Sequence, residues 1–171
     1  MPANAADAER VNAIVLLRRV LEEAPSRLDK LSDTPVARRP CPAKWSPKEH
    51  LGHLLDSAAI NQYRLILIQL EENPALPGYD RNRWVELHGY QQRDWREVIE
   101  SWSVLNRELL AAAETAPEAA WRCTCSIAGS APQTLQFMFE EYVDHLLHHL
   151  QHIGIQVDDL RADDRRPTTN D

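Results

Sequence analysis

The sequence contains few glycines and few cysteines, and both shortages restrict the fold. Only five glycines occur in 171 residues, which argues against a turn-rich β-sandwich or barrel. The three cysteines, Cys41, Cys123 and Cys125, cannot form an even disulfide framework. One residue between Cys123 and Cys125 is too short a spacing for easy ring closure. We therefore predict a protein of a reducing compartment, with a cytoplasmic location.

Long apolar runs and clusters of basic residues are also absent. No apolar run reaches the roughly 18 residues that a membrane-spanning helix needs, and residues 1–7 lack the basic and apolar regions of a signal peptide. The net charge is −7 and lysines and arginines do not cluster, whereas phosphate binding needs clustered cations. We therefore predict that neither a membrane nor a nucleic acid is a partner.

The length and the composition predict a single domain. With 43% hydrophobic and 26% charged residues the balance is that of an ordinary globular protein, and 171 residues suffice for one continuous core but hardly for two. We predict one helical domain over residues 1–171, with a core at about 8–156 and a charged, frayed tail at 158–171.

Four stretches with apolar residues three or four positions apart predict long helices. They cover about residues 4–31, 47–72, 91–113 and 134–156. Pro25 is expected to interrupt the first, because proline breaks the helical hydrogen-bond ladder. Four long helices joined by two sizeable connections predict an all-α fold, most economically a four-helix bundle.

The segments between these helices carry their own signals. Ser46, Pro47 and Glu49 predict a capped start of the second helix, because they supply an N-cap, a first-turn proline and a capping box. The proline-containing linker before it disfavours helix. Thr134 is a candidate cap for the fourth helix. Residues 84–90 predict a short helical turn, and residues 123–130 either a short strand pair or an extended loop.

Histidines are concentrated on the fourth predicted helix. Two pairs stand four residues apart, His145 with His149 and His148 with His152, and residues at this spacing lie on one helical face. Such a pair can offer two imidazole nitrogens to one metal ion, with a third ligand from elsewhere. The apolar stripe of this helix places His145 and His149 beside the core and His148 in solvent.

The second predicted helix contains His50 and His53, either of which could supply the third ligand. Spacing does not decide between them, and the main apolar stripe by itself favours His50. We expect the second and fourth helices to pack together and to share a divalent metal ion. A metal-free core network of histidines is the alternative.

Residues 45–54 and 145–153 resemble the two motifs of the DinB/YfiT-like metalloenzymes (DinB superfamily), W-S-x-x-E-x-x-x-H-L and H-x-x-H-H-x-x-H-I. The order and separation of the motifs also fit, so the resemblance covers about residues 8–156. It implies a bundle of the DinB/YfiT-like type with long interhelical connections, frequent homodimers, and metal ligands at His53, His145 and His149. The choice of His53 over His50 rests on this resemblance.

The metal implied by the resemblance is nickel or zinc, with iron, copper or manganese as further divalent candidates. Three neutral imidazoles leave a coordination position open, which suits catalysis. By resemblance, the leading hypothesis is an S-transferase-like enzyme that uses a low-molecular-weight thiol such as glutathione, bacillithiol or mycothiol, together with a small-molecule substrate. A metal-dependent hydrolase and a non-catalytic metal-binding stress-response protein are the alternatives.

No catalytic residue is assigned from the sequence, although several residues are candidates for other roles. Asp56, Glu141 and Asp144 lie near the proposed ligands in sequence and could supply the general base of a hydrolase, whereas the capping box accounts for Glu49. The last of the three is expected to point away from the apolar stripe.

Residues 73–90 could face a substrate, with Arg81 and Arg83 attracting an anionic group. An ordinary solvated connection explains the same residues equally well. His88 is expected to be a surface or hydrogen-bonded histidine. Cys123 and Cys125 form only a weak metal-binding motif.

Overall fold

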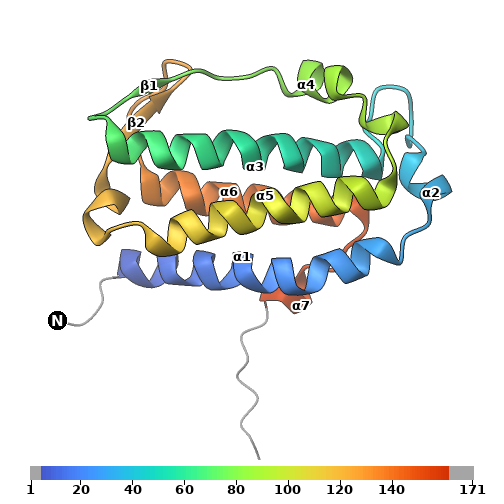
Figure 1. The fold of residues 1–171 in the computed structure, drawn as a ribbon, viewed down its shortest axis with the longest axis horizontal. Helices are drawn as coiled ribbons and strands as arrows, with labels where there is room; N and C mark the ends of the chain where they lie inside the picture. The colour runs from blue at the N-terminus through green and yellow to red at the C-terminus, as the bar shows by residue number, and fades with distance from the viewer. Residues whose placement is uncertain (1–4, 162–171) are drawn as a thin grey trace, which may run out of the picture.

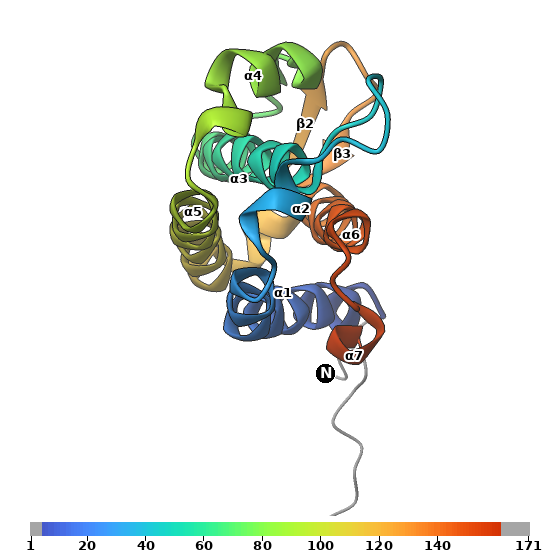
Figure 2. The ribbon, with the colours of Figure 1, turned by 90° about the vertical axis from the view of Figure 1, so that its right-hand side faces the viewer.

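The computed structural model describes residues 5–161, and four long helices make up most of it. They are α1 (Ala5–Asp29), α3 (Pro47–Leu70), α5 (Trp95–Thr115) and α6 (Leu135–Ile153). The helices run side by side along the long axis of the molecule (Figure 1). Seen from one end, α1 and α3 lie on opposite sides of the bundle with α5 and α6 between them (Figure 2). The predicted four-helix bundle is confirmed.

Short elements occupy the connections. The short helices are α2 (Asp33–Ala37), α4 (Arg81–His88) and α7 (Asp158–Arg161), with 3₁₀ turns η1 (Tyr90–Gln92) and η2 (Glu118–Arg122). The strands are β1 (Ala75–Leu76), β2 (Thr124–Ile127) and β3 (Gln133–Thr134). β1 pairs with β2 in parallel, Ala75 opposite Ser126, and β2 pairs with β3 antiparallel, Thr124 opposite Thr134. Within residues 123–130 only Thr124–Ile127 form a strand, and both of its partners, β1 and β3, lie outside the segment.

Three local expectations were wrong, each because burial overrides a local signal. Pro25 does not interrupt α1, since Ala24 and Leu28 on either side of it are fully buried and hold the helix against the core. The linker contains α2, and the Val36 side chain, which is only 1% exposed, anchors this helix to the core. The start of the tail forms α7, with Leu160 fully buried. Residues 162–171 of the expected frayed tail lie outside the described residues.

The predicted caps at the starts of α3 and α6 are confirmed. The Glu49 backbone N–H donates to Ser46 Oγ at 3.2 Å, and the Ser46 N–H donates to Glu49 Oε2 at 2.9 Å, which completes the capping box. At α6, the Phe137 N–H donates to Thr134 Oγ1 at 3.1 Å. These caps fix where each helix begins and therefore which way its histidines point.

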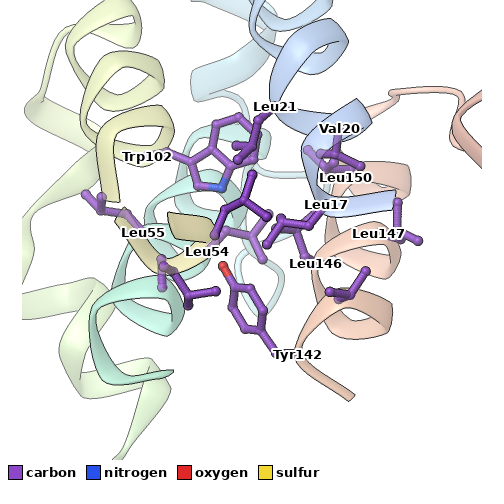
Figure 3. Packing of buried hydrophobic residues seen from close by; sticks show 14 of the residues in the cluster. Leu17, Val20, Leu21, Leu54, Leu55, Trp102, Tyr142, Leu146, Leu147 and Leu150 are labelled. Atoms are coloured by element: carbon purple, nitrogen blue, oxygen red, sulfur yellow. The ribbon is translucent and has the colours of Figure 1, made fainter. Parts of the chain in front are cut away.

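The core lies between the four helices and covers α3 on two sides. Figure 3 shows Leu17 of α1, Leu54 of α3, Trp102 of α5 and Leu146 of α6 packed together, and all four are fully buried. Each apolar side chain of this size contributes about 1.5–3 kcal/mol through burial. Because α3 packs against both α5 and α6, histidines away from its main stripe also face protein. None of the described helices is long and apolar enough to cross a bilayer.

Gly52 of α3 gives Tyr90 room to lie directly on the helix. A Cβ atom built at position 52 would stand 2.2 Å from Tyr90 Cδ2 and 2.3 Å from its Cγ. The Tyr90 ring is 1% exposed, so it has little freedom to move away. Its hydroxyl reaches across to donate a hydrogen bond to Asp56 Oδ1 at 2.6 Å.

We predict that Gly52→Ala lowers the free energy of unfolding, although alanine is the better helix former by about 1 kcal/mol. Overpacking against a fixed ring costs about 1–3 kcal/mol and should prevail. Urea denaturation of Gly52→Ala, Tyr90→Ala and the double variant tests this as a double-mutant cycle. In the Tyr90→Ala background the glycine substitution should become neutral or stabilising. An equal cost in both backgrounds would contradict the proposed contact.

Candidate metal centre

Three imidazoles from two helices converge beside the core. His53 comes from the first half of α3, and His145 and His149 come from adjacent turns of α6. One ring nitrogen from each residue lies within 4.8 Å of the other two. The Nε2 atoms of His53 and His145 are 3.1 Å apart, and the ring centroids of His145 and His149 are 4.5 Å apart. The three residues named from the sequence are therefore brought together.

Burial keeps these imidazoles neutral. His53 is 1% and His149 is 7% exposed. Burial, followed by the neighbouring histidines, lowers the pKa of His53 to about 3 and that of His149 to about 2. Burial likewise lowers the pKa of His145. At neutral pH all three rings carry a free lone pair, which is the form that binds a metal ion.

The donor set fits a divalent metal ion better than a self-contained hydrogen-bond network. In a satisfied core network every buried ring nitrogen should have a partner, yet the buried Nδ1 of His53 has none within the described residues. Two ligands at 2.0–2.1 Å from a tetrahedral ion stand about 3.3 Å apart, close to the 3.1 Å between His53 and His145. Three neutral nitrogens suit zinc or nickel, and also copper or iron.

A second group of histidines borders this cluster on the solvent side. His50 is half-buried, and its Nδ1 lies 2.8 Å from Nδ1 of His149, a distance at which one ring can donate its N–H to the other. The exposed His148 and His152 face each other with their Nε2 atoms 3.1 Å apart. His152 also stacks on His50, with centroids 5.1 Å apart. The expected exposure of His148 is confirmed.

The apolar stripe of α3, taken by itself, favoured His50 as the histidine beside the core. The structure shows instead that His53 is buried and His50 is only half-buried. His53 lies inside the protein because α6 covers the side of α3 that the stripe leaves open. Trp45 packs on the His53 ring at 5.0 Å between centroids, and Tyr79 stacks on it at 6.4 Å. His50 instead contacts the three-histidine cluster from outside, through His149.

The carboxylates near the ligands in sequence have other partners. Asp56 is 2% exposed, accepts a hydrogen bond from Tyr90 and stands with Oδ1 2.7 Å from Nδ1 of His88; burial raises its pKa. Asp144 pairs with Arg161 at 3.1 Å, and Glu141 is exposed. None of these three lines the cavity beside the histidines. The expectation of a hydrogen-bonded His88 is confirmed.

Glu49 has structural roles in this arrangement. Besides closing the capping box, its carboxylate accepts a hydrogen bond from Arg39 Nε at 2.8 Å. Its pKa falls to about 2, because hydrogen bonds from Arg39, the Ser46 backbone and Gln91 outweigh the opposing effect of burial. The carboxylate therefore stays charged at neutral pH and remains engaged in these hydrogen bonds.

Cys123 and Cys125 do not form a metal-binding pair. Cys125 lies in β2 and is buried, while Cys123 ends the η2 turn before the strand and is exposed. Among the described residues, the only group of three or more ligand side chains close enough to hold an ion is the histidine cluster.

A cavity of about 880 Å³ adjoins the histidines and is large enough for a small molecule. Its wall includes Trp45, His50, His145 and His149, and also Arg81, whereas Arg83 does not line it. Of the two arginines named from the sequence, one therefore faces the site and the other does not.

Sequence reasoning missed two cations on this wall, Arg38 and Lys44. They belong to the connection between α2 and α3, and no spacing in an irregular segment indicates which way a side chain points. The Trp45-Ser46 start of the first motif was the available signal, because it places this connection beside the first turn of α3.

Comparisons with known proteins agree with the fold and identify the family. Residues 16–153 match the family model of the DinB superfamily. Among solved structures, YfiT from Bacillus subtilis, described as a probable metal-dependent hydrolase with an unusual four-helix bundle topology, superimposes with a TM-score of 0.77. The two sequences are 21% identical over 90% of this chain and 89% of YfiT. A comparison with curated proteins gave no significant match.

We predict that the metal-free protein loses stability as the pH falls below 6.5. The folded chain keeps His53 and His149 neutral down to pH values near 3 and 2, whereas the unfolded chain takes up protons at about pH 6.5. Protons then favour unfolding, by up to about 1 kcal/mol per histidine between pH 6.5 and 5.5. Urea denaturation across this range should show a smaller loss for His53→Gln than for wild type.

His148→Gln is the matched control, because that ring is exposed. It should keep most of the pH dependence of the wild type. Equal pH dependence in wild type and His53→Gln would mean that the buried imidazole is not held neutral.

Proposed function

The chain belongs to the DinB superfamily, and on this premise we propose that it is a divalent-metal-dependent enzyme. His53, His145 and His149 would hold the ion. The observation that carries the proposal is the convergence of three ring nitrogens within 4.8 Å of one another, all on neutral imidazoles. Nickel or zinc suits this donor set best, and iron, copper or manganese would also bind.

The reaction we propose is S-transfer, in which the sulfur of a low-molecular-weight thiol forms a bond to a small electrophilic substrate. The thiol proton goes to a base, and the leaving group of the substrate departs with the electrons of its broken bond. A bound divalent ion would lower the pKa of a thiol sulfur placed against it. The cavity has no carboxylate on its wall within the described residues, and a thiol that already ionises near neutral pH needs no strong base. His148 and His152 line the same cavity and can accept the thiol proton.

His50 would act as a positioning residue for His149. When the Nδ1–H of His149 is donated to Nδ1 of His50, the other ring nitrogen, Nε2, keeps its lone pair for the ion. Burial, and the neighbouring His152, lower the pKa of His50 to about 4. It is therefore neutral at pH 7 and able to accept that proton.

Metal-dependent hydrolysis is a second candidate, because YfiT is described as a probable metal-dependent hydrolase. Hydrolysis needs a base that removes a proton from water. Asp56 and Asp144 are engaged elsewhere, so a histidine of the cavity wall would have to serve. A non-catalytic metal-binding role is less well supported, since the cavity beside the histidines offers room for a substrate.

We also propose a homodimer in the cytoplasm, as the sequence resemblance implies. The mass of the purified protein from light scattering tests the dimer. A mass of about 19.6 kDa, that of one chain, would contradict it.

We predict about one divalent ion per chain in protein purified without a histidine tag, and little metal in His53→Ala or His149→Ala. Each substitution leaves two imidazoles, too few for a stable site. Elemental analysis provides the measurement, with His88→Ala as the control that should keep its metal. His50→Leu should keep one ion but bind it about 10 to 100 times more weakly, as for other partners of metal ligands.

Undiminished metal in both His53→Ala and His149→Ala would place the ion elsewhere. Equal affinity in wild type and His50→Leu would remove the positioning role of His50 while leaving the three ligands in place.

We predict that turnover of electrophilic substrates by the metal-loaded protein requires an added thiol. Glutathione, bacillithiol and mycothiol should be compared against a panel of electrophiles, with product identified by mass spectrometry. A conjugate carrying the thiol, lost in His149→Ala, supports S-transfer. Turnover of an ester or amide at the same rate without thiol would favour the hydrolase.

A further inference from the structure

The cavity beside the histidines is positively charged in an acidic protein. Arg38, Lys44 and Arg81 line it, and no aspartate or glutamate does so among the described residues. The whole chain carries a net charge of −7. The three cations thus stand apart from the excess of carboxylates on the rest of the chain.

These cations also lack the partners that other arginines have. Carboxylates pair with many arginines outside the cavity: Arg10, Arg18, Arg27, Arg39, Arg83, Arg93, Arg96 and Arg161. Among the residues whose side chains the structure describes, no carboxylate forms an ion pair with Arg38, Lys44 or Arg81. Their charges remain available to a ligand.

Arg81 is the cation most closely tied to the histidine cluster. Its guanidinium carbon lies 5.9 Å from the centre of the Trp45 ring, and Trp45 in turn packs on His53. Arg81 also lines the same cavity as His145 and His149.

A ligand of this cavity would therefore meet positive charge on two sides. Neutral histidines do not offset the charge of a divalent ion, and the cavity wall contributes three more cations. The remainder of the wall includes Pro35, Pro40 and Ala43 together with the Trp45 ring, which suit a small apolar body. The volume of about 880 Å³ accommodates a molecule of drug-like size.

We propose that the substrate or thiol bound in this cavity is a small organic anion, held through its carboxylates by Arg81 together with Arg38 and Lys44. This rests on the proposed function and specifies the ligand class of the same site. Guanidinium groups bind carboxylates through two parallel hydrogen bonds, so Arg81 would orient the anion with its reactive end toward the histidines. The lysine would add charge without that directional preference.

Arg83 provides a matched control within the same helix. It lies two residues after Arg81 in α4, is exposed, and pairs with Glu86 at 2.7 Å. Two residues correspond to about 200° of helical rotation, so the side chains leave the helix on opposite sides. Arg81→Gln and Arg83→Gln remove the same charge from the same helix, but only the first removes it from the cavity wall.

The test is calorimetric titration of the metal-loaded protein with three probes. Mercaptosuccinate carries a thiol and two carboxylates, succinate carries the carboxylates alone, and 2-mercaptoethanol carries an uncharged thiol. We expect mercaptosuccinate to bind most tightly and succinate to bind measurably. Arg81→Gln should weaken both anions about tenfold, the loss expected for one charged hydrogen-bonding partner, and should leave 2-mercaptoethanol unchanged.

Arg83→Gln should bind all three probes as the wild type does, and Arg38→Gln/Lys44→Gln should weaken the two anions further. The anion affinities should fall with added salt, because the cations are exposed. Metal content before and after each titration confirms that no probe removes the ion and that no variant loses it.

The outcomes separate this inference from the proposed function. If mercaptosuccinate binds no more tightly than 2-mercaptoethanol, or if Arg81→Gln and Arg83→Gln behave alike, the anion inference is wrong while thiol binding stands. If succinate binds as tightly as mercaptosuccinate and 2-mercaptoethanol does not bind, the anion inference holds and the thiol proposal fails. If none of the three binds, both are wrong.

Discussion

The site depends on one constraint: the contact of α3 with α6 shields its histidines from water. A buried imidazole stays neutral, and it then has one N–H donor and one lone pair that each need a partner. The cluster places ring nitrogens against ring nitrogens, at 3.1 Å for His53 with His145 and 2.8 Å for His50 with His149. A divalent ion between the rings would accept one lone pair from each of His53, His145 and His149 at once, which no single N–H can do. Nδ1 of His53 would then carry the proton of that ring, and it has no partner in the described part of the chain.

The same constraint explains why acidic residues stay away from the cavity. A carboxylate beside three lone pairs and an ion would satisfy part of the charge and fill the open coordination position. Asp56 instead contacts Tyr90 and His88, Asp144 contacts Arg161, and Glu49 closes the start of α3. An ion held by the three histidines would therefore keep an open coordination position and an uncompensated positive charge, and both favour the binding of an anionic or sulfur ligand.

Local rules in the sequence predicted the parts of the structure that local physics determines. The capping box at Ser46 and the four-residue spacing of His145 and His149 depend only on neighbouring positions, and both are confirmed in geometry. The predicted break at Pro25 and the predicted fraying of the segment that contains Leu160 were both wrong. The burial that overrides these local signals involves residues distant in sequence.

The choice between His50 and His53 shows the same limit inside the site. One apolar stripe describes a helix that is covered on one side, whereas α3 is covered by α5 and by α6. The resemblance to family motifs carried the information that spacing lacked, since a motif reflects the packing of the whole fold. Arg81 and Arg83 could not be separated either, because the start of α4 at residue 81 was not predicted closely enough to give their directions.

The exposure of the histidine side chains increases from His53 to the cavity wall, and this order determines how a ligand reaches the site. His53 is almost completely buried, His149 is slightly more accessible, and His148 and His152 are exposed on the cavity wall. Tyr79 stacks on the His53 ring, and Trp45, which packs on the same ring, forms part of the cavity wall. The cavity therefore gives a ligand a route to the histidines on the side where Arg81 stands. Because the open approach and the unpaired cations lie on the same side, an anionic group attracted to the wall would bring its reactive end to the histidines.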